Sequence, residues 1–451
     1  MAQDSSTETS PLLRNGEVHD SDDEVDPHVV RKSNDKTNYT GRAIVLYLLT
    51  LIFIAALVVL LGFKEHLPDQ ILPWIGELPR EPTRAALAVL DVAPVIVNLP
   101  ILVRYLYANN VSAVDLNSRM PGHVDIPRLR EGKVGGFFWS VYVSCPEIKD
   151  AENFTEPSWR VRDTLEQIDV ARSLIDKYPD TFQSASTSED VTTSIINGKI
   201  ASLLGVEGGH QLGNSISVLR QYYSLGARYL TLTHTCHNAF ADSSGPTAPL
   251  HNGLSPLGRR LIDEMNRLGM LVDLSHTSDE TAIQALNYSR APVIWSHSSA
   301  RAIHDVQRNL PDDVLRLVGS GPGQKEAVVM VNFVPDFVAV PGNASVASVA
   351  DHVEHIARIT GKDHVGLGSD FDGMNGAPTG LEDVSKYPAL IAELRKRGWN
   401  KFELAGLTGA NILRVFQGAE RVAKELQDNH TLPVYDLYDK RTDIPRNPFE
   451  L

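Results

Sequence analysis

The sequence is poor in cysteine and in positive charge. Its 451 residues include only two cysteines, Cys145 and Cys236, so at most one disulfide can form, and two buried thiols are the alternative. The formal net charge is −14, and there is no basic stripe or basic motif interleaved with aromatic residues. Such a charge favours solubility and opposes non-specific contact with nucleic acid. We therefore expect no nucleic acid partner.

A second absence lies in the first apolar run of the main domain, residues 94–100, which reads PVIVNLP and has neither a histidine nor a carboxylate. Later runs of the same kind end in such residues: Glu207 in IASLLGVEGG, His276 in MLVDLSH, His297 in PVIWSH and Asp370 in VGLGSDFDG. The polar ends of apolar runs form the rim on which a β/α barrel builds a metal site. The pattern indicates metal-assisted hydrolysis, with one strand that supplies no ligand.

The N-terminal part predicts a tail and a membrane anchor. Residues 1–42 are polar and acidic, and we expect them to be disordered because they can bury little apolar surface. Residues 43–63 carry no charge and are long enough to cross a bilayer as a helix. Basic residues are concentrated before this span, which predicts a type II protein whose main domain is luminal or extracellular, in a vacuole, the secretory pathway or at the cell surface. A cleaved signal peptide is the alternative, but its apolar segment would be shorter and nearer the start.

The remaining chain divides by composition. Residues 64–90 are rich in proline and are expected to form a stem, followed by a barrel at 91–425 and a C-terminal extension at 426–451. Five sequons agree with a luminal, glycosylated domain, and they begin at Asn110, Asn153, Asn287, Asn343 and Asn429.

Apolar runs and amphipathic runs alternate through the main domain. The runs expected to be strands are residues 94–97, 134–143, 200–206, 228–233, 270–274, 292–295, 327–332 and 365–368. Eight strands separated by helices predict a closed (β/α)8 barrel of the TIM type. Helical runs at 384–397 and 401–416 are expected to complete its outer ring.

Three of the rim residues suit a catalytic metal. His276 and His297 end consecutive strands, so their imidazoles can converge on one ion together with Glu207. Two imidazoles and one carboxylate with an open position are typical of catalytic zinc. Each histidine taken alone is more commonly a hydrogen-bonded core residue, and Glu207 could be the carboxylate at a helix start. Their joint occurrence at rim positions favours the metal site.

Other rim residues suit hydrolysis of a peptide-like substrate. His234 ends another strand and can donate a hydrogen bond to a developing oxyanion. Arg308 on a rim loop can hold a carboxylate through two parallel hydrogen bonds, and an ion pair with an aspartate at 312 or 313 is equally compatible with the sequence. Asp370 and Asp372 share one strand end, where one can shuttle a proton while the other caps or orients.

Long blocks of the sequence carry a family resemblance, among them GVEGGH, RYLTLTHTC, RAPVIWSHSSARAI, RNLPDDVL and GLGSDFDG. With these blocks the chain closely resembles the renal-type membrane (microsomal) dipeptidases, zinc metallopeptidases with a barrel of the metal-dependent amidohydrolase-like kind. It looks like a fungal-type member with an N-terminal anchor. The resemblance covers roughly residues 91–420.

The resemblance implies roles for the rim residues. Glu207 would bridge two zinc ions, and His276 and His297 would complete the first site. His234 would polarise the scissile carbonyl, while Arg308 would bind the C-terminal carboxylate of a dipeptide substrate. Asp370 would be the acid/base, Cys145 and Cys236 would form the family's disulfide, and a homodimer is compatible with the family.

The first strand departs from the family pattern, in which a His-x-Asp pair supplies the other ligands of the second zinc. Here Val97-Asn98 stands in a shorter stretch, and the His-x-Asp at His123 precedes IPRLR, which is a different segment of the family. Either the second metal is absent or a misplaced splice junction has altered this stretch.

The leading hypothesis is a membrane-anchored zinc dipeptidase. In this hypothesis a metal-bound hydroxide attacks the peptide carbonyl, His234 steadies the oxyanion and Asp370 passes a proton to the leaving amine. One alternative is a catalytically impaired relative that binds one metal or none. A second is a single-metal hydrolase of another amide or lactam.

Overall fold

The chain divides into two compact units, Met1–Leu67 and Pro68–Leu451. The computed structural model describes residues 39–62, 72, 78–89, 93–145, 159–246 and 248–441. Of the tail expected at 1–42, only residues 39–42 are described. The sequon at Asn153 lies outside the described residues.

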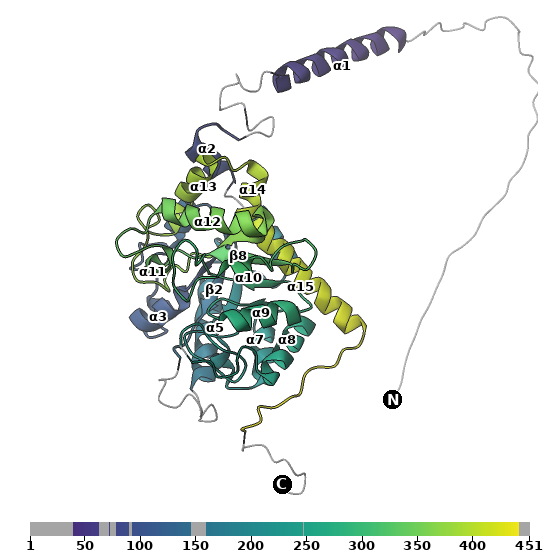
Figure 1. The fold of residues 1–451 in the computed structure, drawn as a ribbon. Coiled ribbons are helices and arrows are strands. Elements are labelled where there is room, and N and C mark those ends of the chain that lie inside the picture. Colours follow the sequence, from purple (N-terminus) through teal and green to yellow (C-terminus); the bar gives the residue numbers. More distant parts are fainter. Residues whose placement is uncertain are drawn as a thin grey trace, which may run out of the picture. The chain divides into compact units, whose positions relative to one another are not determined.

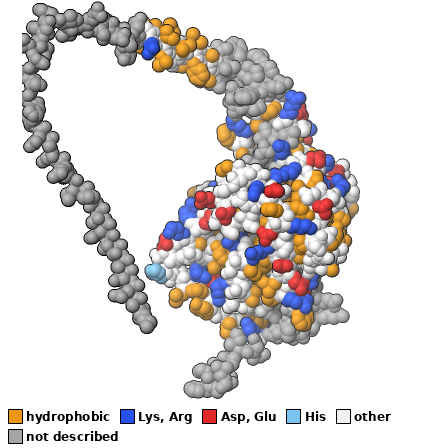
Figure 2. Space-filling model, turned by 180° about the vertical axis from the view of Figure 1, so that it is seen from behind, with side chains coloured by type: hydrophobic (Ala, Val, Ile, Leu, Met, Phe, Trp, Pro, Cys, Tyr) orange, Lys and Arg blue, Asp and Glu red, His pale blue; other side chains and the backbone are white. Residues whose placement is uncertain are grey.

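The described part of the first unit is one helix, α1 (Tyr39–Gly62). It includes nearly all of the apolar span expected at 43–63. Its window Gly41–Val58 has a mean hydropathy of 2.3, and none of it is buried. Hydrophobic side chains cover its surface in Figure 2. By length and composition, this helix can cross a membrane.

The second unit is built on a parallel sheet in the order β1-β2-β4-β5-β6-β7-β8-β9. These strands are β1 (Ala93–Val97), β2 (Val134–Val141), β4 (Ile200–Val206), β5 (Ala227–Thr231), β6 (Leu271–Asp273), β7 (Val293–Trp295), β8 (Ala327–Val331) and β9 (Val365–Leu367). Every neighbouring pair is parallel. All eight strands lie where the sequence pattern placed them, and the arrangement is consistent with a TIM-like fold.

One strand was not expected. Strand β3 (Phe182–Ser184) pairs with the first residues of β4, while β5 pairs with the last residues of β4. Its sequence, Phe-Gln-Ser, has one apolar residue and so lacks the apolar run by which the equally short strands β6, β7 and β9 were recognised.

Helices surround the sheet (Figure 1). They are α2 (Pro82–Val89), α3 (Leu99–Tyr107), α4 (Ile126–Glu131), α5 (Arg160–Lys177), α6 (Ser188–Ile196), α7 (Ile216–Ser224), α8 (Pro256–Leu268), α9 (Asp279–Tyr288), α10 (Asp312–Leu315), α11 (Pro335–Val338), α12 (Val346–Thr360), α13 (Tyr387–Lys396), α14 (Lys401–Ala405) and α15 (Asn411–Asp428). Helix α8 illustrates the local signals: Ser255 caps its start, Pro256 follows, and Gly269 ends it at a φ of 80°.

Two of the helices differ in detail from the sequence expectation. The run at 401–416 is not one helix, because an irregular turn at Gly406–Ala410 separates α14 from α15. Helix α2 lies in the segment expected as a stem and packs against α13.

The hydrophobic core has two parts, one on each face of the sheet. The inner part is made mainly of strand residues and one face of α15, with one residue of α6: Phe138, Ala185, Val191, Ala201, Leu203, Tyr229, Leu271, Ala291, Ile294, Val328, Met330, Ile412, Val415, Phe416 and Ala419. Neighbouring strand residues such as Phe137, Trp139 and Leu204 belong to the outer part, which most of the other helices cover. Since alternate strand residues point to opposite faces, the inner set continues into polar residues at the carboxyl ends of the strands, such as Ser140 on β2.

Candidate active site

The expected site residues meet at one edge of the sheet. Glu207 directly follows β4, while His276, His297 and Asp370 follow β6, β7 and β9 by two or three residues. Asn98 directly follows β1. Because the strands are parallel, all of these positions lie at their carboxyl ends, where a barrel holds its active site.

Glu207 is the centre of a cluster of histidines. Its Oε1 lies 3.0 Å from Nε2 of His297, 3.2 Å from Nε2 of His276 and 3.7 Å from Nε2 of His234. The Nε2 atoms of His276 and His297 are 2.9 Å apart. The side chains of Glu207 and His297 are almost fully buried, whereas His234 is 14% exposed and faces the open side of the cluster.

A chain of hydrogen bonds orients His297. Ser296 Oγ donates to Asp273 Oδ2 at 2.6 Å, so it must accept the proton of His297 Nδ1, 2.8 Å away. Thr231 also donates to Asp273. A neutral His297 therefore has its lone pair on Nε2, toward Glu207. Without a metal, burial lowers the pKa of His297, but the charges of Glu207 and Asp370 outweigh burial and raise this pKa, so Nε2 then carries the second proton of the ring. The sequence analysis missed Ser296 and Asp273, although a charged residue inside the apolar run MLVDL was a usable signal.

These residues fit a divalent metal. Two imidazole nitrogens with their lone pairs facing each other at 2.9 Å repel unless a proton or a cation lies between them. A carboxylate oxygen and two imidazole nitrogens are a donor set that zinc accepts. The described residues contain one other group of potential ligands, Cys145, His210 and Cys236, but its two cysteines are joined as a disulfide.

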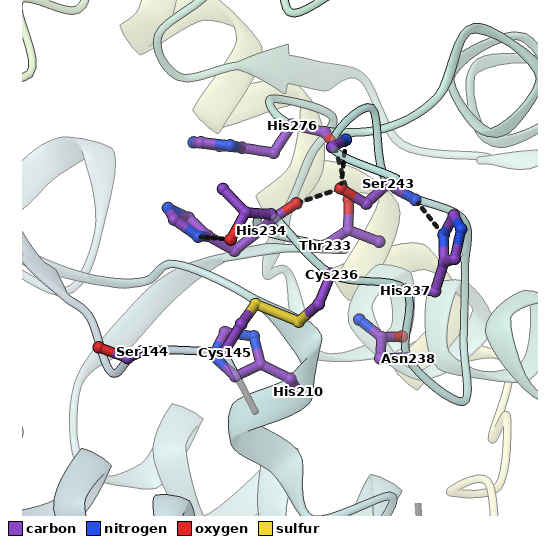
Figure 3. Close-up of a disulfide and its surroundings, with 12 residues drawn as sticks. Ser144, Cys145, His210, Thr233, His234, Cys236, His237, Asn238, Ser243 and His276 are labelled. Atoms are coloured by element: carbon purple, nitrogen blue, oxygen red, sulfur yellow. Dashed lines mark hydrogen bonds between the residues drawn. A yellow bond between two sulfur atoms is a disulfide. The ribbon is translucent and has the colours of Figure 1, made fainter. Parts of the chain in front are cut away.

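The disulfide fixes the loop that carries His234. Cys145, just after β2, is bonded to Cys236, just after β5, with their Cα atoms 6.0 Å apart, which confirms the pairing implied by the resemblance. Figure 3 shows the rings of His234 and His276 beside each other near this bond, and their centres are 4.2 Å apart. Tyr142, which the sequence analysis missed, also packs against His234, with the ring centres 4.5 Å apart.

Asp370 and Asp372 have different environments. Asp370 Oδ1 accepts a hydrogen bond from Asn98 Nδ2 at 2.8 Å, and the same amide lies 3.4 Å from Glu207 Oε2. Asp372 instead accepts from the backbone N–H of His123 at 2.5 Å. Both aspartates have a positive φ, a strained conformation that is common at functional sites. Only Asp370 therefore points to the Glu207 cluster.

The second His-x-Asp of the sequence does not form a ligand pair. Asp125 caps α4 and forms an ion pair with Arg128 at 2.7 Å. His123 Nδ1 accepts from the backbone N–H of Asp372 at 3.1 Å. The two residues thus serve different local structures, as expected for a segment other than the metal pair.

Arg308 is directed into the site. It donates to the backbone oxygen of His297 at 2.7 Å and to Ser298 Oγ at 2.8 Å, and its buried Nε has no hydrogen-bond partner among the described residues. The alternative ion pair is not formed: the aspartates at 312 and 313 pair with His355 and Arg316. Arg308 is thus a buried cation beside the histidine cluster.

Burial and charge set the protonation states of the site. Burial raises the pKa of Glu207, but the charge of His297 and hydrogen bonds from the histidines outweigh it and hold this pKa well below its usual range. Burial raises the pKa of Asp370 to about 6, against the opposing charge of His297. Burial also lowers the pKa of His234 to about 4 and that of Arg308 to about 10. The site therefore combines an ionised carboxylate, a neutral histidine and a carboxyl group that titrates near neutral pH.

The described sequon asparagines are all on the surface. Asn110, Asn287, Asn343 and Asn429 have exposed side chains. Exposure is a requirement for glycosylation, which stays a prediction for these positions.

The fold and the site define a metal-dependent hydrolase built on a parallel α/β sheet. The comparisons identify the family: the family model described as "Membrane dipeptidase (Peptidase family M19)" matches residues 84–430. The chain belongs to this family and is a hydrolase of the metallopeptidase class.

Three similar proteins illustrate the relationship. The dipeptidase aclJ of Aspergillus oryzae is 47% identical over 74% of this chain and 78% of its own. An uncharacterized dipeptidase of Schizosaccharomyces pombe is 46% identical over 73% of this chain and 81% of its own. A solved metallopeptidase of Rhodobacter sphaeroides, liganded with a phosphinate mimic of the dipeptide L-Ala-D-Ala, has a TM-score of 0.63 at 26% identity and covers 73% of this chain and 100% of its own.

Proposed function

We propose that this chain is a membrane-anchored zinc dipeptidase. The observation that carries the proposal is the convergence of His276, His297 and Glu207 on one point, with Asp370 and Arg308 beside them. A metal held by the first three would supply a Lewis acid that activates water and polarises the peptide carbonyl. The dipeptidase relatives and the dipeptide mimic bound to the Rhodobacter protein support a dipeptide as substrate.

Arg308 would bind the substrate's carboxylate. Its guanidinium is buried, and its Nε has no hydrogen-bond partner in the described part of the chain. The two groups that accept from it, a carbonyl oxygen and a hydroxyl, are neutral. A buried cation without an anionic partner strongly favours an anionic ligand. A dipeptide presents one such group, its C-terminal carboxylate.

His234 and Asp370 would act on the scissile bond. His234 is kept neutral by burial and lies at the open side of the cluster, where its ring N–H can donate to the oxygen on which negative charge develops. Asp370, whose pKa is raised to about 6, can accept a proton from the attacking water and then give it to the leaving amine. The intact cluster gives no reason to favour the catalytically impaired alternative.

Hydrolysis of simple dipeptides by the purified full-length chain tests this function. We expect hydrolysis that a chelator abolishes and that added zinc restores, with much lower but measurable activity on the same dipeptides when their C-terminus is amidated. Retained hydrolysis after complete metal removal would contradict the proposal. Hydrolysis of a lactam but of no dipeptide would favour the single-metal amide or lactam alternative.

We also infer the features of the whole chain that the site does not determine. Helix α1 would be a type II anchor, with the domain luminal and glycosylated. Protease treatment of sealed microsomes should then remove only the N-terminal tail.

The sheet would close into a complete (β/α)8 barrel, since Val97 at the end of β1 forms a parallel bridge with Phe371 after β9. The domain limits 1–42, 43–63, 64–90, 91–425 and 426–451 and a homodimer stay predictions.

A further inference from the structure

The two oxygens of Glu207 have different neighbours. Oε1 faces the "histidine side" of the site, made of His234, His276 and His297. Oε2 faces the "amide side": it accepts from Ser140 Oγ at 2.9 Å and lies 3.4 Å from Asn98 Nδ2, which donates to Asp370 Oδ1 at 2.8 Å. One side thus offers nitrogen lone pairs, while the other already contains hydrogen-bond donors.

Asn98 lies between two carboxylates. Its amide nitrogen carries two protons and has no lone pair for a cation, so it can serve Glu207 Oε2 and Asp370 Oδ1 at once. All three side chains are buried, with exposed fractions of 4% for Asn98, 3% for Glu207 and 7% for Asp370. Two buried carboxylates are unfavourable unless donors or a cation compensate their negative charge. The amide protons of Asn98 do so at the place where a second cation would have to bind both oxygens.

The orientation of the amide follows from the same charges. In the present orientation Asn98 Oδ1 is buried and has no hydrogen-bond partner among the described residues, which is unfavourable. The reversed amide would place this oxygen against two carboxylate oxygens and lose both donor contacts, which costs more because charged acceptors would be left unpaired. The donor orientation is therefore the more stable one unless a cation enters.

Asn98 is also fixed through the backbone. Its N–H donates to the carbonyl of Phe371 at 2.8 Å. A Cβ atom at position 373 would lie only 2.2 Å from Asn98 Nδ2 and 2.4 Å from Asp370 Oδ1, so the glycine found there lets the loop after β9 close against both side chains. The contact between Asn98 and Asp370 is built into the packing of β1 against this loop.

The amide side is poor in ligands for a transition metal. It offers the carboxylate oxygens of Glu207 and Asp370, and Asp370 takes part in no ion pair among the described residues. Zinc prefers nitrogen or sulfur ligands in part of its coordination sphere, and only the histidine side provides them.

We propose that this chain holds a single divalent ion, on the histidine side, and that the Asn98 amide takes the place of a second ion by linking Glu207 to Asp370. The inference rests on the proposed function, because it assumes that the histidine side binds metal. Asn98 is then a positioning residue: it holds the carboxyl group of Asp370 at a fixed place beside the metal ligands.

Metal counting on the full-length chain in detergent tests the proposal. The metal-free chain is titrated with Co²⁺ and with Zn²⁺, and the bound ions per chain are measured after dialysis. We expect one ion for the unmodified chain and two for Asn98→His, which adds an imidazole beside the two carboxylates. Asn117→His, the same change at an exposed asparagine, is the matched control and should bind one ion. If Asn98→His does not fold, Asn98→Asp, which replaces the amide by a third carboxylate at the same place, carries the same test.

The outcomes separate this inference from the proposed function. Two ions on the unmodified chain would overturn the single-ion centre but leave the dipeptidase proposal intact. No bound ion would overturn the metal-dependent function itself. One ion on both the unmodified chain and the folded variants would show that Asn98 does not exclude the second ion.

A kinetic measurement tests the positioning role separately. Asn98→Ala should keep one ion and lower kcat about tenfold at an unchanged KM, because the acid/base is displaced while the substrate's binding groups are intact. An unchanged kcat would contradict the role of Asn98 in holding Asp370.

Discussion

The histidine side and the amide side share the carboxylate of Glu207, but different groups compensate the buried negative charge on each side. Strands β5, β6 and β7 lead to nitrogen lone pairs around Oε1, whereas β1, β2 and β9 lead to hydrogen-bond donors and a second acid around Oε2. The first arrangement needs a cation or a proton to be stable. The second is compensated by neutral groups and is stable by itself. A single glutamate can therefore be a metal ligand on one side and a hydrogen-bond acceptor on the other.

Glu207→Gln should have the largest effect, because it removes the charge on which both sides depend. We expect loss of bound metal and a fall in kcat/KM of about a thousandfold or more, which is about 4 kcal/mol of transition-state stabilisation. Circular dichroism should show an intact fold, since a residue at the rim contributes little to the core. Metal content equal to that of the unmodified chain would contradict the ligand role.

Asp370→Asn should leave the metal bound on the histidine side and remove only the acid/base function of the amide side. We expect kcat to fall by about 10²- to 10⁴-fold, the usual contribution of a general acid/base, with the same metal content. A variant that loses its metal would show that the two sides are not independent.

The pH profile distinguishes the role of this acid. Because burial raises the pKa of Asp370 to about 6, its carboxyl group gains a proton as the pH falls through about 6. The ionised form is the one that accepts a proton from water, so kcat/KM should decrease about tenfold per unit below this pH. In Asp370→Asn this limb should disappear. Its persistence would assign the titration to another group.

Arg308→Ala tests whether this arginine, next to the histidine cluster, binds the substrate's C-terminal carboxylate. We expect kcat/KM for a dipeptide to fall about a hundredfold, because two hydrogen bonds to a charged carboxylate are lost. A substrate with an amidated C-terminus should lose much less. The control is Arg316→Ala, an exposed arginine that pairs with Asp313 and should be neutral. An equal loss on both substrates would assign Arg308 a structural role.

Ser296→Ala should give the smallest effect and is limited to the histidine side. It breaks the hydrogen bonds that link His297 to Asp273, so the tautomer of His297 is no longer fixed. We expect metal affinity to fall by about 10- to 100-fold, measured by competition with a chelating dye. Ser194→Ala, which removes a buried hydroxyl that donates to the carbonyl of Asp190 away from the site, serves as the matched control.

The sequence predicted the strands well because each is an apolar run with polar ends. It also brought Glu207, His276, His297 and Asp370 to one edge, since all carboxyl ends of a parallel sheet share that edge. It missed β3, whose three residues form no apolar run, and the break before α15 at Gly406–Ala410, where the backbone is irregular. Short elements depend on what packs against them, which a pattern in one segment does not contain.

The partners of individual side chains were beyond the sequence. It left Arg308 undecided between a substrate and an ion pair, and the structure turns it toward His297 because the aspartates at 312 and 313 are paired elsewhere. It named Asn98 only as a position without a ligand. This amide can donate to Asp370 only because β1 lies against the loop after β9. The two residues are some 270 positions apart in the chain.

By itself, the amino-acid sequence determined the family, the parallel strand order, the apolar helix and the types of residue at the rim, because these depend on composition and on local periodicity. Only the tertiary structure decided which oxygen of Glu207 faces the histidines, which of Asp370 and Asp372 faces Glu207, and what compensates the buried acid next to it. Those contacts join strand ends that are distant in the chain. Their directions are fixed by packing and by the need to pair every buried charge.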